Sequence, residues 1–336
     1  MPLFLAMLRS ETATSPERRS RALAGLRAYQ QARRPAPRPP KPVFARAGRA
    51  ILRDYGGSGT PLVVVPSLIN PPHVLDLARG NSLMRWLARQ GVRPMLVDWG
   101  TPSPGERDQD ITAHIEQLLL PLIGALPRPP LLMGYCLGGT MAMAAACATP
   151  VAGLATVAAP WRFAGYGDSR SAMDSVWHHA HENCDRMGLV PMEMLQAGFW
   201  QLDPARTVAK YERFSAMPRG SASASAFVAL EDWANGGAPL TYAAGRQLFD
   251  DFLHADLPGR GKWIVAGKPV GPEALDCPAV EFVSASDRIV PAATAAGLAD
   301  SRILSAGHVG MIVGGRGRVQ LWEPLADWLR AHRLPR

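Results

Sequence analysis

One short motif constrains this chain more than any other feature of its sequence. Residues 134–139 read GYCLGG, directly after an apolar run and before an Ala- and Met-rich stretch. The pattern predicts a strand, a sharp turn and a helix, with Cys136 at the tip of the turn. Gly134, Gly138 and Gly139 suit such a turn, because its strained backbone leaves no room for larger side chains. The helix directs backbone N–H groups at the sulfur, which favours a thiolate. Taken alone, the motif is equally compatible with a buried structural cysteine.

Two downstream loops supply the partners that a nucleophilic cysteine needs. When a nucleophile sits on a strand–turn–helix of this kind, the acid and then the histidine follow later strands. Here residues 279–283 read as a strand that leads to Asp287, and residues 301–304 read as a strand that leads to His308. Parallel sheets build their sites at the carboxyl ends of strands. The sequence therefore predicts a catalytic triad of Cys136, His308 and Asp287.

Several motifs together resemble the polyhydroxyalkanoate synthases, a polyester-making branch of the α/β-hydrolase fold. The GYCLGG motif is similar to the family's lipase-like box, residues 286–291 (SDRIVP) to its acid loop, and residues 307–311 (GHVGM) to its histidine loop. Residues 67–77 resemble the segment after the family's third strand, and residues 97–100 (VDWG) resemble the short class III catalytic chains. The resemblance runs from about residue 50 to the C-terminus.

This resemblance implies a mostly parallel sheet covered by helices on both faces, with a helical cap inserted into it. It implies an acyltransferase that moves 3-hydroxyacyl groups from CoA thioesters to a growing polyester through an acyl-Cys136 intermediate. Acyl-CoA is then a substrate, and no cofactor or metal is expected. Two positions depart from the family's pattern. Arg288 stands where a histidine generally follows the acid, and Arg162 stands in a segment that usually holds an aspartate.

The fold also predicts how the negative charge of a tetrahedral intermediate is held. Enzymes of this type use the backbone N–H after the nucleophile and a second N–H from the loop after an early strand. We expect these donors to be Leu137 and Ile69. A thiol nucleophile suits a thioester substrate, because moving an acyl group from one thiol to another changes the free energy little.

Two other functions stay open on the sequence alone. One is a hydrolase, either a thioesterase or an intracellular polyester depolymerase, since the same triad serves hydrolysis and both arginines alter the surroundings of the site. The other is a non-catalytic, granule-associated or scaffold protein. Its mark would be a lost triad residue, but all three residues are present. Exclusion of water from the acyl-enzyme separates a transferase from a hydrolase, and no motif reports it.

Charge is concentrated at the N-terminus. The chain has a net charge of +8, yet residues 1–50 alone carry eleven Lys and Arg against two Asp and Glu. Residues 16–31 have a helical composition, and the proline-rich residues 34–43 are typical of an extended linker. We expect a basic arm over 1–44, which is either a docking element for an acidic partner or a solvated leader.

The rest of the chain divides into a core and an insertion. Strands alternate with helices over 45–164 and 276–336, which predicts the α/β-hydrolase core, whereas the alternation stops over 165–275, the expected cap. The expected strands are 49–53, 62–65, 94–97, 130–133, 151–157, 279–283 and 301–304, and the expected helices are 81–90, 111–123, 139–148, 292–299 and 321–331. Histidines 178, 179 and 181 lie in the cap, but they lack the i, i+4 spacing of a zinc-binding helix, so no metal site is expected.

Location and partners follow from what the chain contains. The apolar run at 1–8 is short and follows no basic residue, and no run approaches about 18 apolar residues, so we expect neither a signal peptide nor a transmembrane segment. A free thiolate fits a reducing cytoplasm. No basic face with interleaved aromatic residues occurs, so nucleic acid is not expected to bind. The expected partners are an acyl-CoA thioester, a polyester granule surface, and either a second copy of the chain or a second subunit.

Overall fold

The computed structural model describes residues 2–333, which form two compact units. A helical unit consists of the chain up to Pro39 together with Met192–Gly237. A sheet unit consists of Pro40–Pro191 together with the chain from Ala238 onward. The insertion expected at 165–275 is therefore shared between the two units.

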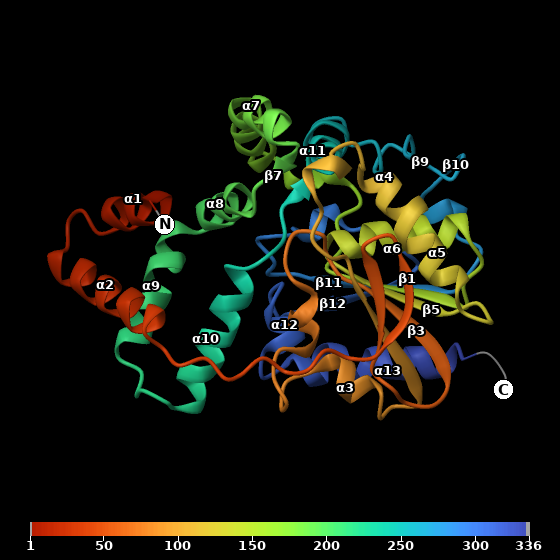
Figure 1. Cartoon of the computed structure of the whole chain (residues 1–336), viewed down its shortest axis with the longest axis horizontal. Coiled ribbons are helices and arrows are strands. Elements are labelled where there is room, and N and C mark those ends of the chain that lie inside the picture. Colours follow the sequence, from red (N-terminus) through yellow and green to blue (C-terminus); the bar gives the residue numbers. More distant parts are fainter. Residues whose placement is uncertain (1, 334–336) are drawn as a thin grey trace. The chain divides into compact units, whose positions relative to one another are not determined.

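The sheet unit is built on eight strands in the order β1-β2-β4-β3-β5-β6-β11-β12 (Figure 1). These are β1 (Val43–Ala47), β2 (Ala50–Asp54), β3 (Thr60–Val65), β4 (Val92–Asp98), β5 (Leu131–Tyr135), β6 (Gly153–Val157), β11 (Ala279–Ser284) and β12 (Asp300–Leu304). The six strands from β4 to β12 are parallel, and β1 and β2 add an antiparallel hairpin at one edge. Every residue of β5 is buried, as a central parallel strand requires. The predicted mostly parallel sheet is confirmed.

Helices cover both faces of this sheet. One side carries α3 (Leu83–Leu87), α12 (Gly310–Val313) and α13 (Glu323–Ala331), and the other carries α5 (Leu120–Gly124) and α6 (Leu137–Ala148) (Figure 1). The helix expected at 111–123 runs through α4 (Ile111–Ala113) and η3 (His114–Leu119) into α5. Residues 137–146 of α6 are all buried, because their small and flexible side chains fill the space beneath the central strands.

Two expected helices are shorter in the structure. The prediction of a helix over 292–299 is wrong beyond one turn, η7 (Ala292–Thr294). The buried Glu281 carboxylate on β11 accepts hydrogen bonds from the backbone N–H groups of Ala296, Gly297 and Leu298, at 3.1, 3.1 and 2.9 Å. Those N–H groups cannot then continue a helix. The helix expected over 81–90 is α3, which begins after Ser82, whose Oγ accepts the Arg85 N–H at 3.0 Å.

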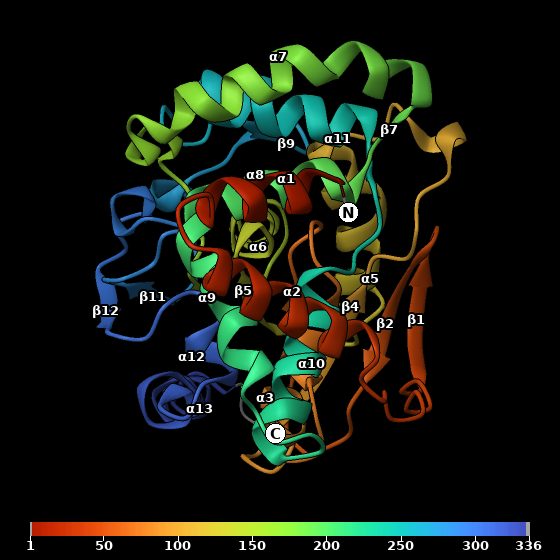
Figure 2. The same cartoon turned by 90° about the vertical axis from the view of Figure 1, so that its left-hand side faces the viewer.

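Part of the insertion belongs to the sheet unit. It comprises α7 (Ser169–Met187), the short strands β7 (Leu189–Val190) and β8 (Leu240–Thr241), α11 (Tyr242–Arg246) and η5 (Gln247–His254). α7 lies along α11 and η5 (Figure 2). The Trp177 ring stacks on Phe249 with centroids 4.9 Å apart, and its indole N–H donates to Asp250 Oδ1 at 2.7 Å. These contacts make α7 a packed part of the unit.

The helical unit joins the N-terminal arm to the middle of the insertion. Its helices are α1 (Pro2–Glu11), α2 (Pro16–Gln30), α8 (Met192–Leu202), α9 (Pro204–Ser215) and α10 (Ala222–Ala234). α2 confirms the helix expected near 16–31, whereas α1 was not expected. Both α1 and α2 pack along α9 (Figure 2). The arm is therefore part of a folded unit.

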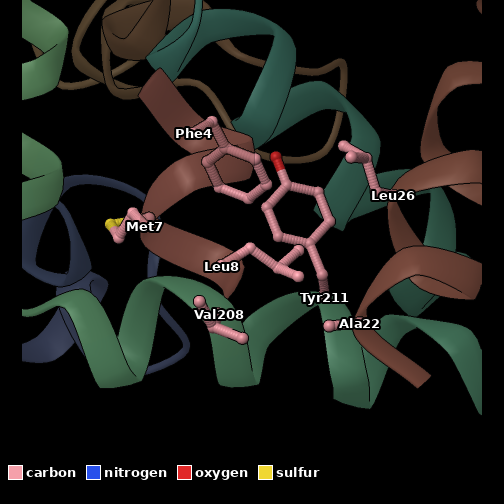
Figure 3. Packing of buried hydrophobic residues seen from close by; sticks show 7 residues of the cluster. All are labelled: Phe4, Met7, Leu8, Ala22, Leu26, Val208 and Tyr211. Carbon is pink, nitrogen blue, oxygen red and sulfur yellow. The ribbon is translucent and has the colours of Figure 1, made fainter. Parts of the chain in front are cut away.

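An apolar cluster holds this unit together. Its buried members come from α1, α2 and α9 and are Phe4, Met7, Leu8, Ala22, Leu26, Val208 and Tyr211 (Figure 3). The Phe4 ring meets the Tyr211 ring edge-on, with centroids 5.2 Å apart. Full burial of a side chain of this size contributes about 1.5–3 kcal/mol. Several such side chains therefore supply most of the attachment of the arm.

Polar contacts flank the cluster. The Arg18 guanidinium donates to Glu212 Oε1 at 2.8 Å, and the Tyr29 hydroxyl donates to Asp232 Oδ1 at 2.7 Å. Arg34 also reaches Asp232, with Nη2 3.0 Å from Oδ1. Cations of the arm thus face carboxylates of the insertion. No helix within residues 2–333 is both long and apolar enough to cross a membrane.

Candidate active site

Cys136 occupies the tip of the turn between β5 and α6. Its backbone has φ 56° and ψ −134°, a conformation that residues other than glycine rarely adopt. The Cys136 N–H donates to Val157 O at 3.0 Å, which ties the turn to β6. The structure therefore has the strained turn that the motif predicts, and Cys136 itself is only partly buried.

The glycines around Cys136 are required by close packing. A Cβ on Gly138 would lie 2.2 Å from Val65 O at the end of β3, and a Cβ on Gly134 would lie 2.4 Å from Gly138 O. A Cβ on Gly139 would lie 2.4 Å from the Ala159 Cβ. Real Cβ atoms do not approach other atoms so closely, so each position excludes alanine without a backbone shift.

Asp287 and His308 are hydrogen-bonded to each other. Asp287 Oδ2 lies 2.6 Å from His308 Nδ1, and both side chains are almost fully buried. Asp287 Oδ1 accepts the backbone N–H groups of Ile289 and Val290, at 2.8 and 2.9 Å. The carboxylate is thus fixed by its own loop, and it fixes the imidazole with Nε2 left for another partner.

Cys136 is the group that acts on His308 from the other side, because its side chain lies close enough to raise the pKa of the imidazole. Burial lowers the pKa of His308, but the negative charge of Cys136 and the contacts with Asp287 raise it further, to about 10. The imidazole is therefore held as its cation beside the sulfur at neutral pH. The structure brings together the three residues that the sequence predicts as a triad.

Tyr135 steadies the histidine loop. Its hydroxyl donates to His308 O at 3.2 Å, and its ring lies 5.0 Å from the imidazole centroid. Burial raises the pKa of Tyr135 well above its ordinary value, and the charges of Cys136 and Asp287 raise it further. The phenol therefore stays protonated and acts as a fixed donor to the loop.

The two expected oxyanion donors lie in different local settings. Leu137 is the first residue of α6, so its N–H has no partner four residues earlier within the helix. The Ile69 N–H, in contrast, donates to Ser67 Oγ at 3.1 Å within its own loop. It would have to exchange this bond before it could serve an oxyanion.

Sequence reasoning missed Tyr166, which lies near the triad. It ends the short helix η4 (Phe163–Tyr166) after β6. Burial raises the pKa of Tyr166 well above its ordinary value, and the charges of Cys136 and Asp287 raise it further. No motif points to this tyrosine, because its proximity to the site comes from how the loop folds.

The other candidate residues of the sequence lie elsewhere. His178 and His181 lie on α7 with ring centroids 5.9 Å apart, and residues 2–333 contain no group of three or more His, Cys, Asp or Glu placed to hold a metal ion. Arg162 and Arg288 are both exposed. The Arg162 guanidinium lies over Gly297, where a Cβ would be 3.1 Å from Nη2.

The sequence is similar to those of known polymerase subunits. No family model matches the chain. It is 27% identical to the Poly(3-hydroxyalkanoate) polymerase subunit PhaC of Haloferax mediterranei over 285 residues, which cover 80% of this chain and 58% of that protein. It is 26% identical to the PhaC subunit of Haloarcula marismortui over 301 residues, which cover 84% of this chain and 63% of that protein. The chain thus spans less than two thirds of the length of these two relatives.

Solved structures identify the fold. A lipase in its open form superposes with a TM-score of 0.54 at 14% identity, over 85% of this chain and 96% of the lipase. Identity this low is informative about the fold alone. The chain has the α/β-hydrolase fold, as the sequence predicts.

Proposed function

The chain is a PhaC-like α/β-hydrolase-fold protein, and on that premise we propose that it is a cysteine-nucleophile acyltransferase. It takes 3-hydroxyacyl groups from CoA thioesters and passes them to the hydroxyl end of a growing polyester. The observation that carries this proposal is the strained Cys136 close to the buried, hydrogen-bonded pair His308 and Asp287. The similarity to polymerase subunits supports the choice of substrate.

In the first half of the reaction, the Cys136 thiolate attacks the thioester carbonyl carbon. The Leu137 N–H stabilises the oxyanion that forms. As the intermediate collapses, the bond between carbon and the CoA sulfur breaks, and CoA leaves as a thiol with the proton of His308 Nε2. The products are acyl-Cys136 and a neutral imidazole, which Asp287 keeps in the orientation needed for the next step.

In the second half, neutral His308 takes the proton of an alcohol, and the alcohol oxygen attacks the acyl-Cys136 carbonyl. An ester bond forms, the bond to sulfur breaks, and Cys136 returns as a thiolate beside a protonated His308. Water in place of the alcohol gives a free acid, which is the hydrolase alternative. The two functions share every residue named here and differ only in the acceptor.

Incubation of the full chain with 3-hydroxybutyryl-CoA tests the proposal. CoA release and the acyl product are followed together, with Cys136→Ala as the inactive variant and Cys147→Ala as the matched control. We expect CoA release with an ester-linked oligomer, absent in Cys136→Ala and retained in Cys147→Ala. Free 3-hydroxybutyrate as the sole product would instead establish the hydrolase. Absence of CoA release from the unaltered chain would overturn the proposal.

A further inference from the structure

The turn that carries Tyr166 is held rigidly against the loop of the proposed acid. The backbone N–H groups of Trp161 and Arg162 donate to Thr294 O, at 2.7 and 2.9 Å. A Cβ on Gly165 would lie 2.3 Å from Ala293 O, so the two loops are in direct backbone contact. The loop that follows β6 therefore has its position set by the loop that follows Asp287.

The opposite side of the turn is fixed as well. The Phe163 N–H donates to Asp256 Oδ1 at 2.7 Å, and the Phe163 ring is almost fully buried. The Tyr166 ring stacks on that ring with centroids 6.0 Å apart and an interplanar angle of 30°. The Tyr166 side chain is held by this turn and by the buried Phe163 ring, so it loses little conformational entropy when it binds a ligand.

The hydroxyl of Tyr166 is unused by the protein. Within the part of the chain that the structure describes, it forms no hydrogen bond, whereas Tyr29, Tyr135 and Tyr211 all do. The side chain is half-buried, and the turn that carries it is in backbone contact with the loop that follows Asp287, where the charges of Asp287 and Cys136 act on the phenol. A polar group left without a protein partner beside a reactive centre is suited to a ligand.

We propose that the Tyr166 hydroxyl binds the 3-hydroxyl group of the acyl chain attached to Cys136. This inference rests on the proposed function and names the group that the site recognises. The carbonyl oxygen of the acyl chain is served by the Leu137 N–H, and the leaving thiol by His308. The 3-hydroxyl is then the remaining polar atom of the acyl group. A phenol both donates and accepts, so it can pair with a hydroxyl in either sense.

Tyr166 cannot act as a second base in this role. Burial and the neighbouring negative charges raise its pKa, so the phenol keeps its proton at neutral pH. It therefore contributes binding and orientation, and proton transfer stays with His308. Removal of the hydroxyl should then weaken the reaction of acyl groups that carry a 3-hydroxyl and leave others unchanged.

The test compares two thioesters that differ only in that hydroxyl, 3-hydroxybutyryl-CoA and butyryl-CoA. The rate of acylation of Cys136 is measured by CoA release and by the mass of the acylated chain. We expect Tyr166→Phe to lower kcat/KM about tenfold for 3-hydroxybutyryl-CoA and less than about twofold for butyryl-CoA. Tyr242→Phe, another half-buried tyrosine whose charged neighbours are Asp185, Asp250, Arg246 and Arg107, is the matched control and should change neither rate.

Equal effects of Tyr166→Phe on the two thioesters, or no effect on either, would overturn the inference while the proposed function stands. Failure of the unaltered chain to react with either thioester would overturn both. The rate of iodoacetamide alkylation at Cys136 shows whether the variant keeps an intact site, and it should be unchanged in Tyr166→Phe.

Discussion

His308 shows at the scale of one residue how a site can reverse the effect of burial. Burial by itself favours the neutral imidazole, because the cation is poorly solvated there. In His114 burial dominates and lowers the pKa to about 4, although Nδ1 lies 2.6 Å from Asp110 O. His308 is as deeply buried, yet Cys136 and Asp287 raise its pKa to about 10. The chemistry available to a histidine in this fold is therefore decided by its two nearest neighbours.

The four cysteines should differ in how fast they are alkylated, because only Cys136 lies beside His308. Burial raises the pKa of Cys147, Cys184 and Cys277, the last to about 11. We expect iodoacetamide at pH 7 to label Cys136 first, as read by peptide mass. Asp287→Asn should slow that labelling about tenfold or more, because the amide no longer stabilises a positive charge on His308 next to the sulfur. Faster labelling of Cys147 than of Cys136 would contradict the assignment.

A pH dependence of stability follows as well. Because the pKa of His308 is raised from its ordinary 6.5 to about 10, its proton stabilises the folded state fully below pH 6.5 and progressively less as the pH rises to about 10. The free energy of unfolding lost in His308→Ala should therefore be larger at pH 6.5 than at pH 10. Chemical denaturation at both values measures it, with the exposed His178→Ala as the control. A constant difference would show that His308 carries no raised pKa.

The sequence was sufficient to predict that Cys136, Asp287 and His308 come together, but it did not predict all of their neighbours. Asp287 and His308 each follow a recognisable strand and lie in a distinctive loop motif, so they could be predicted. Tyr166 and Glu281 carry no such mark. Their surroundings depend on which loop lies across from them, and one sequence does not contain that information.

At the scale of elements, glycine decides how closely the arm approaches the insertion. A Cβ on Gly25 of α2 would lie 1.9 Å from Tyr211 O on α9, so these helices touch through their backbones. The composition of residues 16–31 predicted α2 as a helix. It did not identify α9 as the partner of α2, because a small residue on a helix face is compatible with many neighbours.

Gly25→Ala should therefore separate the two helices. We expect it to lower the free energy of unfolding of the chain by about 1–3 kcal/mol, as overpacking of a tight contact does. Gly198→Ala in α8 is the matched control, since a Cβ there has no atom within 4 Å. That change should be neutral or stabilising by up to about 1 kcal/mol, because alanine favours a helix over glycine. Equal destabilisation by both variants would contradict the contact.

At the scale of the whole molecule, the arm and the middle of the insertion form a unit of their own. The basic composition of the arm led us to expect either electrostatic docking or a free leader. In the structure its cations face Glu212 and Asp232, while its apolar side chains fill the centre. Ion pairs at a partly exposed surface contribute little, whereas burial of apolar side chains contributes much. The charge pattern was visible in the sequence, but the partner of the arm was not.

Removal of residues 1–39 tests whether apolar burial or ion pairing contributes more to the stability of the helical unit. We expect the truncated chain to lose the thermal transition of the helical unit and to bind a hydrophobic dye, because Val208 and Tyr211 lose their cover. Glu212→Gln in the full chain should change the transition only slightly, in low salt and in high salt alike. Loss of the thermal transition of the helical unit in high salt, with the full chain, would instead show that ion pairs attach the arm.

The pairing of α2 with α9 also sets an order of events during synthesis. Arg18 and Glu212, which meet across this pairing, are 194 residues apart in the chain. At about 5–20 residues per second, a ribosome needs about 10–40 s to make that stretch. Over this interval the nascent arm exposes Phe4, Met7 and Leu8 without the helix that later buries them. The helical unit thus folds only after α9 has been translated. Until then, its first helices expose the kind of apolar side chains that a chaperone binds.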